Sequence, residues 1–259
     1  MKSFFEPITT LYFNVRILVG RKLFGSFGER VTKISRKRVL KGPCLASELE
    51  AMLFVAQSTS IPIPKVHTAY GYHGDFYIEM DYIRGETLET AWRDSMSPEQ
   101  KEELRHLQPP QPELVASAKG GGAVDCRIGS LPFGPYHSQD EFHSFLRGGI
   151  PLDDCTKVYA EAVTHCHSRK YRTCFCHADL APRNIIVQRG RITGVVDWQF
   201  GGWYPEYWEY TKAHYSLYTE ADWVTQLGNV MENYEEPLKA EHLQRNKQRN
   251  QVLRVVQIT

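Results

Sequence analysis

The chain has 259 residues, of which 42% are hydrophobic and 24% are charged, and these values are typical of a soluble globular protein. This length allows one large domain or two lobes around a shared cleft. The formal net charge is +1, because lysines and arginines are scattered among almost as many acids. The composition therefore argues against a basic nucleic-acid-binding domain and against electrostatic attraction to an anionic membrane. No apolar run in the sequence is long enough to span a bilayer.

The first residues and the cysteines both predict a cytosolic (cytoplasmic) protein. Residues 1–7 contain an acid and a proline before the apolar core of a signal peptide could develop. Six cysteines are too few for a disulfide scaffold in a chain this long, so we expect free thiols. One cluster contains zinc-ligand residue types: His165, Cys166, His167, Cys174, Cys176 and His177. Its members alternate or abut instead of following the usual two-to-four-residue spacing, which favours small buried side chains over a zinc site.

The N-terminal part predicts a small α+β unit. Leu49, Met52, Leu53 and Ala56 recur at helical spacing, and prolines then send the chain out extended. We expect, in order, strands at 29–34 and 38–41 joined by a turn at 35–37, a helix over 47–58, an extended segment at 61–64, a strand at 76–80 and a break at 84–86.

The remainder of the chain is predicted to be mainly helical. Pro109–Gly134 is loop-like, and residues 114–117 and 124–128 are candidates for a small hairpin across its glycines. The last fifteen or so residues are polar and poorly patterned, so we assign them no role. The expected helices are 87–92, 97–107, 139–146 and 153–168.

The chemically informative stretch runs from Cys176 to Trp198. Residues 185–187 and 192–196 are apolar and β-branched, and a glycine lies between them, which predicts a hairpin. With a Gly190-Arg191 loop, the antiparallel register places Asn184 directly opposite Asp197. An amide and a carboxylate at one end of a hairpin suit Mg²⁺, and Asp179, five residues before Asn184, is placed to act as a base.

This spacing, His-x-Asp-x-x-x-x-Asn with a later Asp, is that of kinase catalytic loops. In detail the sequence resembles the aminoglycoside phosphotransferase (APH)/choline-kinase-like family, particularly its fungal APH-domain branch. The catalytic block is the specific part of the resemblance, and the ordered set of motifs covers most of the chain. The supporting segments are 47–55, 61–66, 133–136 and 202–210.

The resemblance implies a role for each matching residue. Asp179 would be the catalytic base, and His177 would stiffen the catalytic loop through hydrogen bonds. Asn184 and Asp197 would hold Mg²⁺. For the nucleotide phosphates, the resemblance implies Lys41 paired with Glu48; Glu50 and Lys33 are the alternatives for the two roles.

Two features depart from the family pattern, and the substrate region is ambiguous. The nucleotide-covering loop should be glycine-rich, but the only candidate is Gly25–Gly28, and the position two after Asp197 is Gln199 where relatives often have an acid. Segment 201–238 contains seven acids, one lysine and nine Trp or Tyr residues. It could line a pocket for a cationic acceptor, or it could be an aromatic core beneath solvated helix faces.

Together these features predict an α+β, protein-kinase-like two-lobed fold. A small β-rich N-lobe spans 1–83, a hinge lies near 81–85, and a larger, mainly helical C-lobe spans 84–259. The expected function is Mg²⁺-dependent transfer of the γ-phosphate of ATP or GTP, bound between the lobes, to a hydroxyl of a small molecule. The alternative is a kinase-like protein that binds nucleotide or metabolite without turnover. We expect no nucleic-acid or membrane partner.

Overall fold

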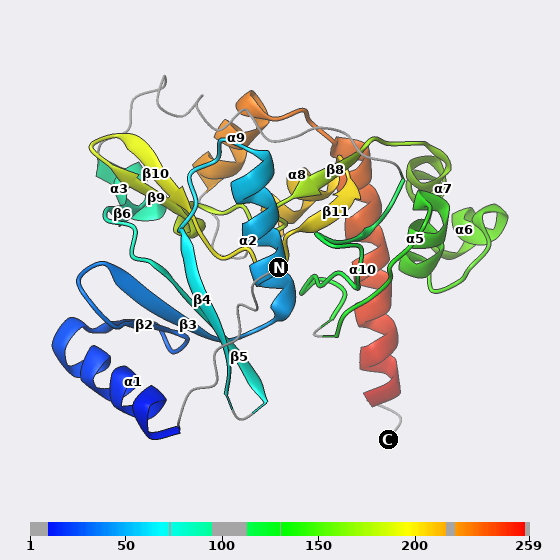
Figure 1. The fold of residues 1–259 in the computed structure, drawn as a ribbon. Coiled ribbons are helices and arrows are strands. Elements are labelled where there is room, and N and C mark those ends of the chain that lie inside the picture. The colour runs from blue at the N-terminus through cyan, green and yellow to red at the C-terminus, as the bar shows by residue number, and fades with distance from the viewer. Residues whose placement is uncertain (1–9, 73, 95–112, 130, 216–220, 257–259) are drawn as a thin grey trace. The chain divides into compact units, whose positions relative to one another are not determined.

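The computed structural model describes residues 10–72, 74–94, 113–129, 131–215 and 221–256. It is a mixed α and β structure that divides into two compact units, each built from two stretches of the chain (Figure 1). Unit 1 comprises Met1–Glu103 and Ala181–Gly201, and unit 2 comprises Leu104–Leu180 and Gly202–Thr259. The catalytic-loop motif, residues 177–184, is thus divided: its first four residues belong to unit 2, and the stretch from Ala181 to Gly201 packs with the N-terminal part of the chain.

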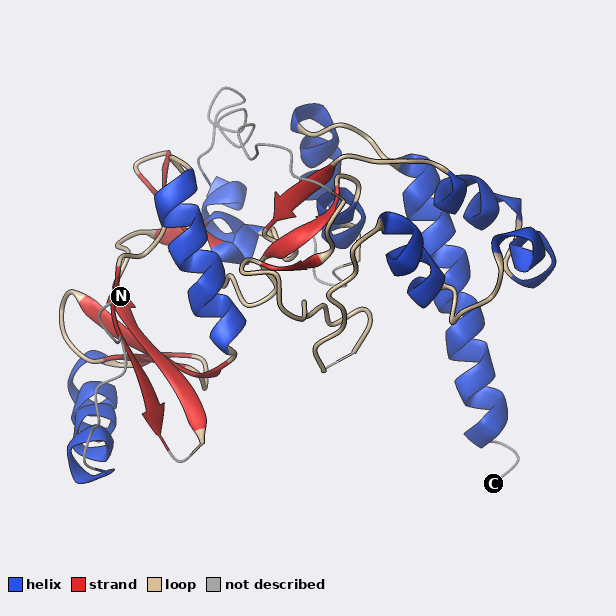
Figure 2. Cartoon of the chain, turned by 45° about the vertical axis from the view of Figure 1, so that its right-hand side comes forward, coloured by secondary structure: helices blue, strands red, loops and turns tan. Residues whose placement is uncertain are grey.

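Unit 1 is organised around a five-stranded antiparallel sheet with strand order β1-β2-β3-β5-β4 (Figure 2). The strands, helix and turn predicted between residues 29 and 80 are confirmed, whereas α1 and β4 were not predicted. The elements before the sheet's last strand are α1 (Thr10–Phe24), β1 (Ser26–Phe27), β2 (Val31–Lys33), β3 (Arg38–Cys44), α2 (Ala46–Ser58), β4 (Val66–Tyr72) and β5 (Asp75–Asp81).

Alternation along β3 sends neighbouring side chains to opposite faces of this sheet. Leu40 packs in a core cluster with Phe13 of α1 and with Tyr70 of β4. The next residue, Lys41, contacts Glu48 of α2 instead. One face of the sheet therefore packs against α1, and the other presents a buried lysine to α2.

A buried carboxylate on the α1 face joins four elements. Glu79 of β5 is 2% exposed and pairs with Arg16 at 2.7 Å and with Arg38 at 2.8 Å. Tyr70 donates a further hydrogen bond of 2.7 Å to the same carboxylate. Burial by itself raises the pKa of Glu79, but the hydrogen bonds from Arg38, Arg16 and Tyr70 outweigh it and the pKa is lowered. Glu79 thus stays ionised and ties α1 to the sheet.

A second, three-stranded sheet of unit 1 has the order β10-β9-β6. The hairpin predicted between residues 185 and 196 is confirmed. Gly85 precedes β6 at φ +144°, and a Cβ there would lie 2.3 Å from the carbonyl oxygen of Val187, so only glycine fits. The elements are β6 (Glu86–Thr87), α3 (Leu88–Asp94), a 3₁₀ turn at Pro182–Asn184, β9 (Ile185–Gln188) and β10 (Arg191–Val195).

Unit 2 is mainly helical around a small antiparallel sheet with strand order β7-β11-β8. Its large buried side chains include Tyr204, Tyr207 and Trp208, each no more than 2% exposed. The aromatic run is therefore core. The elements are β7 (Ala116–Ser117), α5 (Gln139–Leu146), α6 (Leu152–Val158), α7 (Glu161–Ser168), β8 (Thr173–Cys176), β11 (Gly202–Pro205), α8 (Trp208–Ala213), α9 (Ala221–Val230) and α10 (Glu235–Val256).

Two predictions in unit 2 were wrong. Residues 114–117 and 124–128 do not form a hairpin: Val115 bridges Tyr136, and Ser117 pairs with Gly202 of β11. The glycines instead close a tight turn, in which the Ser117 N–H donates to the carbonyl of Gly121.

The single helix predicted over 153–168 is two helices, α6 and α7. The break lies at Ala160, whose φ is +147°. Just before it, Tyr159 packs against the buried cluster of Val163, Cys166 and Ala240, and its hydroxyl donates to the carbonyl of Arg147.

Three further observations concern helices. The predicted helix over 97–107 lies outside the described residues. The C-terminal segment that received no assignment forms most of α10, a 22-residue helix. Among the helices in the described part of the chain, none combines the length and the apolar character needed to cross a membrane.

The Glu79 network gives a prediction about stability. Glu79→Ala should lower the free energy of unfolding by about 3 kcal/mol, because it leaves two guanidinium groups without their buried partner. Because the folded-state pKa is lowered, the wild-type contribution should be complete above the unfolded-state pKa of about 4.3 and should fade as the pH falls through the folded-state value. Urea denaturation from pH 3 to pH 7 measures both effects. As a control, Asp154→Ala, which removes an exposed pair with Lys157, should cost less than about 1 kcal/mol; equal losses in the two variants would contradict the prediction.

Candidate active site

A buried lysine lies between two carboxylates in unit 1. Lys41 Nζ is 2.5 Å from Glu48 Oε1 and 2.7 Å from Asp197 Oδ1. The side chains of Lys41 and Glu48 are 9% and 1% exposed, whereas that of Asp197 is 33% exposed. The strand β3, the helix α2 and the residue just after the β9–β10 hairpin thus meet at one ammonium group. The sequence predicted the Lys41–Glu48 pair, and the structure contains it.

The electrostatics of this cluster follow from its burial. Burial by itself lowers the pKa of Lys41. The nearby carboxylates of Glu48 and Asp197 raise it by more, so the net shift is upward and the ammonium stays charged. Burial raises the pKa of Glu48, with Lys41 acting in the opposite direction. Glu48 Oε2 is buried and has no hydrogen-bond partner among the described residues. Two carboxyl groups thus share one ammonium, and Arg30 is a second nearby cation that lowers the pKa of Glu48.

Lys33, the alternative to Lys41, has different surroundings. In the register of β2 against β3 it pairs with Val39, so it lies on the same sheet face as Lys41 but one strand further out. Its ammonium stands 3.5 Å from the centre of the Tyr82 ring, and Glu48 pairs with Lys41 instead. The two lysines therefore lie on the same face of the sheet but on different strands, and only Lys41 is next to Glu48.

The predicted register of the hairpin was wrong. The two-residue loop is Arg189-Gly190, both at positive φ, and not Gly190-Arg191. The register also shifts between Ile192 and Gly194, so Val195 pairs with Ile185. The Val196 N–H then donates to the Asn184 carbonyl at 2.8 Å. Val196, and not Asp197, is thus opposite Asn184.

Asn184 and Asp197 nevertheless come from the same end of the hairpin. Asn184 ends the 3₁₀ turn and is 5% exposed, while Asp197 has a φ of +67°, a conformation that aspartate and asparagine tolerate better than most residues. One amide oxygen and one carboxylate fit the preference of Mg²⁺, which is bound by few protein oxygens and keeps water and phosphate as its other ligands. Across the described ranges, no three His, Cys, Asp or Glu side chains gather as a ready-made metal site.

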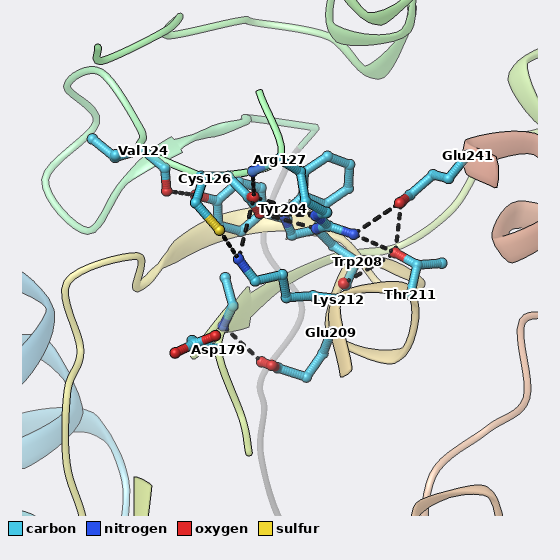
Figure 3. Close-up of polar contacts among 12 residues, drawn as sticks. Val124, Cys126, Arg127, Asp179, Tyr204, Trp208, Glu209, Thr211, Lys212 and Glu241 are labelled. Carbon is cyan, nitrogen blue, oxygen red and sulfur yellow. Dashed lines mark hydrogen bonds and ion pairs between the residues drawn. The ribbon is translucent and has the colours of Figure 1, made fainter. Parts of the chain in front are cut away.

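The catalytic-loop motif in unit 2 is held by a residue that the sequence analysis did not single out. Glu209 of α8 is 4% exposed. Its Oε2 accepts the backbone N–H groups of His177 at 2.6 Å and Ala178 at 3.0 Å, and its Oε1 accepts that of Leu180 at 3.3 Å. His177, itself buried, accepts a hydrogen bond from the Asp179 N–H at 3.2 Å through Nδ1. A carboxylate anchor and a histidine brace thus fix the backbone on both sides of Asp179. Figure 3 shows the Glu209 carboxylate beside Asp179.

One signal in the sequence could have identified Glu209. All six residues of α8 are buried, and a helix buried on every side requires a partner for each charged side chain. An acid inside the aromatic run Tyr207-Trp208-Glu209-Tyr210 was therefore a candidate for an internal anchor. Instead it was counted with the acids of segment 201–238.

Those acids do not form a free anionic surface. Glu206 pairs with Arg172, Glu236 pairs with Arg169, and Glu235 accepts the Tyr210 hydroxyl. Glu232 accepts the hydroxyl of Tyr234. Each of the acids in this segment whose side chain is described is thus engaged by the protein itself.

The structure also shows the surroundings of the two features that depart from the family pattern, Gly25–Gly28 and Gln199. Gly25 and Gly28 have positive φ and flank β1, whose exposed Phe27 stacks on Tyr82 at 5.6 Å between ring centroids. Gln199 is half-buried in the turn that follows the strand β10 and Asp197. Neither observation changes the assignments made from the sequence.

One family model matches part of this chain. The model of the phosphotransferase enzyme family, APH, matches residues 141–245. That segment contains His177, Asp179, Asn184, Asp197 and Glu209. No curated protein matches the chain.

Among solved structures, several aminoglycoside phosphotransferases have a similar fold. The structure of APH(4)-Ia is 16% identical, with a TM-score of 0.59 over 86% of this chain and 82% of that one. A thermostable mutant of the same enzyme, in a ternary complex with ADP and hygromycin B, is 16% identical, with a TM-score of 0.56 over 86% and 83%. ADP-bound APH(2'')-Ib is 15% identical, with a TM-score of 0.55 over 91% and 86%. The chain therefore has the kinase-like fold of aminoglycoside phosphotransferases, and its residues 141–245 match the model of the phosphotransferase enzyme family.

The anchoring role of Glu209 can be tested directly. In Glu209→Gln one acceptor oxygen becomes a donor, so at least one backbone N–H loses its charge-assisted partner. We expect a loss of about 2 kcal/mol in the free energy of unfolding and hydrogen exchange at least tenfold faster at the amides of residues 177–180. The control is Glu206→Gln, which removes a carboxylate paired with the exposed Arg172 and should leave those amides protected. Unchanged protection in Glu209→Gln would show that the carboxylate does not hold the loop.

Proposed function

We propose that this protein is a small-molecule kinase that transfers the γ-phosphate of ATP or GTP to a hydroxyl group, with Mg²⁺ as cofactor. The observation that carries the proposal is the buried ammonium of Lys41 held between Glu48 and Asp197. A lysine fixed by a buried glutamate presents a point charge suited to nucleotide phosphates. The family match over the segment with Asp179, Asn184 and Asp197 supports the same reaction class.

Each residue has a defined part in this proposal. Asp179 accepts the proton of the acceptor hydroxyl or orients it, and Glu209 with His177 holds the loop that positions Asp179. Asn184 and Asp197 hold Mg²⁺, which supplies neutralisation of phosphate charge. Lys41 contacts the phosphates, and Glu48 keeps its ammonium in place. Positioning and charge account for most of the rate in phosphoryl transfer, so a rigid backbone near Asp179 matters as much as its carboxylate.

We extend the proposal to the family branch, the cellular location and the acceptor. The motifs quoted above favour the fungal branch of the APH family, and six cysteines that are all free thiols favour the cytoplasm. The acceptor is a small molecule with a hydroxyl group. The aminoglycosides bound in the related structures, hygromycin B among them, are ligands of those proteins and offer a first panel of acceptors.

Nucleotide binding provides the first test. With Mg²⁺ present, ATP or GTP at a hundred times its Kd should raise Tm by about 6 °C, which corresponds to about 2.7 kcal/mol of ligand stabilisation. Asp197→Asn should remove most of this rise because it takes away the charged metal ligand. If neither nucleotide raises Tm of the wild type with metal, both the kinase proposal and the binding-protein alternative fail.

The two lysines serve as a matched pair in the same experiment. Lys41→Ala should weaken nucleotide affinity at least tenfold, or about 1.4 kcal/mol, whereas Lys33→Ala should stay within about twofold of wild type. A fluorescent nucleotide titration gives the Kd independently of any change in folding stability. The reverse ranking would transfer the phosphate contact to Lys33.

Turnover separates an enzyme from a binding protein. Asp179→Asn should leave the nucleotide Kd within about threefold of wild type and lower kcat by at least a hundredfold against any acceptor found by screening. Retained turnover in this variant would remove Asp179 from the catalytic role. Nucleotide binding by the wild type without turnover across a broad hydroxyl-acceptor panel would favour the binding-protein alternative.

A further inference from the structure

Unit 2 contains a buried charge cluster next to a cavity that the proposed reaction does not use. Arg127 is its centre: its guanidinium donates to Asp125 at 3.0 Å and to Glu241 at 2.9 Å, and it stacks on the Trp208 ring at 4.0 Å (Figure 3). Lys212 is 3.4 Å from the same Asp125. The adjoining cavity has a volume of about 220 Å³. It is lined by Arg127, Ile128, Phe145, Leu146, Trp208, Glu241, Gln244 and Arg245.

Three cations of this cluster, Arg127, Lys212 and Arg245, lie near the carboxylates of Asp125 and Glu241. The Arg127 and Lys212 side chains are each 3% exposed, whereas that of Arg245 is 24% exposed. Arg245 is therefore the cation of the cluster that a ligand in the cavity can reach most readily.

Arg245 lies 4.4 Å from the centre of the Tyr215 ring and has no carboxylate within hydrogen-bond distance among the described residues. Its closest carboxylate is that of Glu241, 3.9 Å from Nη2 and beyond hydrogen-bond distance. Both oxygens of Glu241 already accept hydrogen bonds, from Arg127 and from the Thr211 hydroxyl. Arg245 Nε is buried and has no hydrogen-bond partner among the described residues. Burial lowers the pKa of Arg245, as does the neighbouring Arg127, while Glu241 acts in the opposite direction.

Half of the lining residues are apolar, and these side chains favour an anion with an apolar body. They are Ile128, Phe145, Leu146 and Trp208. A bare inorganic ion would leave this surface in contact with water, whereas a ring-sized apolar body would cover it. A guanidinium group matches the two oxygens of a carboxylate.

We propose that this cavity binds a small organic carboxylate, with its charged end on Arg245 and its apolar body against Phe145 and Leu146. The site is separate from the residues proposed for phosphoryl transfer. It holds a single-ring compound and is too small for a nucleotide. Since Arg127 and Trp208 belong both to the cavity wall and to the packing around α8, an occupant would reinforce the helix that carries Glu209.

Isothermal titration with benzoate and its neutral isostere benzamide tests the proposal. Benzoate should bind the wild type at least tenfold more tightly than benzamide, because only benzoate presents a carboxylate to Arg245. Arg245→Gln should abolish this preference while leaving Tm within about 2 °C of wild type, since it removes a cation that has no close carboxylate. The control variant Arg36→Gln removes an exposed arginine of unit 1 and should preserve the preference.

A second variant keeps the test independent of the folding of Arg245→Gln. Ile128→Trp retains Arg245 but fills the cavity, so it should lower benzoate affinity at least tenfold. Equal affinities for benzoate and benzamide in the wild type would overturn the proposal. A preference for benzoate over benzamide that persists in Arg245→Gln, or a benzoate affinity that is unchanged in Ile128→Trp, would also overturn it, because the ligand would then lie elsewhere.

Discussion

The arrangement of the candidate active site in unit 1 depends on one buried ammonium group. Lys41 needs carboxylate partners because a lone charge in a dry interior is costly, and it obtains them from residues 7 and 156 positions away. That requirement joins a sheet strand, the helix behind it and a hairpin that arrives much later in the chain. It also explains why Ala181–Gly201 packs with the N-terminal stretch. The remaining features of this unit, including the left-handed Asp197, are arranged around that contact.

Local patterns in the sequence predicted the elements of this region well. Leu49, Met52 and Ala56 share a helical stripe, and the helix they predict is α2. The β-branched runs on either side of Gly190 predicted a hairpin, which is present. Such elements are fixed by periodicity and by turn residues a few positions apart, so a single sequence contains enough information. The residue types at the candidate site were recognisable for the same reason, since their spacing lies within one loop and one hairpin.

Long-range pairing was less predictable. The partner of Val115 is Tyr136, and the partner of Ser117 is Gly202, neither of which a local pattern indicates. The loop lies one residue earlier than predicted, at Arg189-Gly190, which moves the partner of Asn184 back by two residues, and a one-residue shift near Thr193 moves it forward again by one. Register depends on such turn positions and bulges, which the sequence does not mark. Glu209 was missed because its partners are backbone groups, which leave no trace in side-chain spacing. Its location inside a wholly buried helix was the available clue.

The left-handed backbone at Asp197 bears on how this protein can change over evolutionary time. Only glycine, asparagine and aspartate adopt that conformation readily, so most substitutions there carry a backbone penalty of about 1 kcal/mol or more. Asparagine and glycine are each reached from aspartate by a single nucleotide change. The mutations that keep the fold are therefore the ones that discard the carboxylate. Under the metal-binding role proposed for Asp197, a lineage of this architecture would lose that role in one step and keep a well-folded chain, so position 197 would separate active relatives from silent ones.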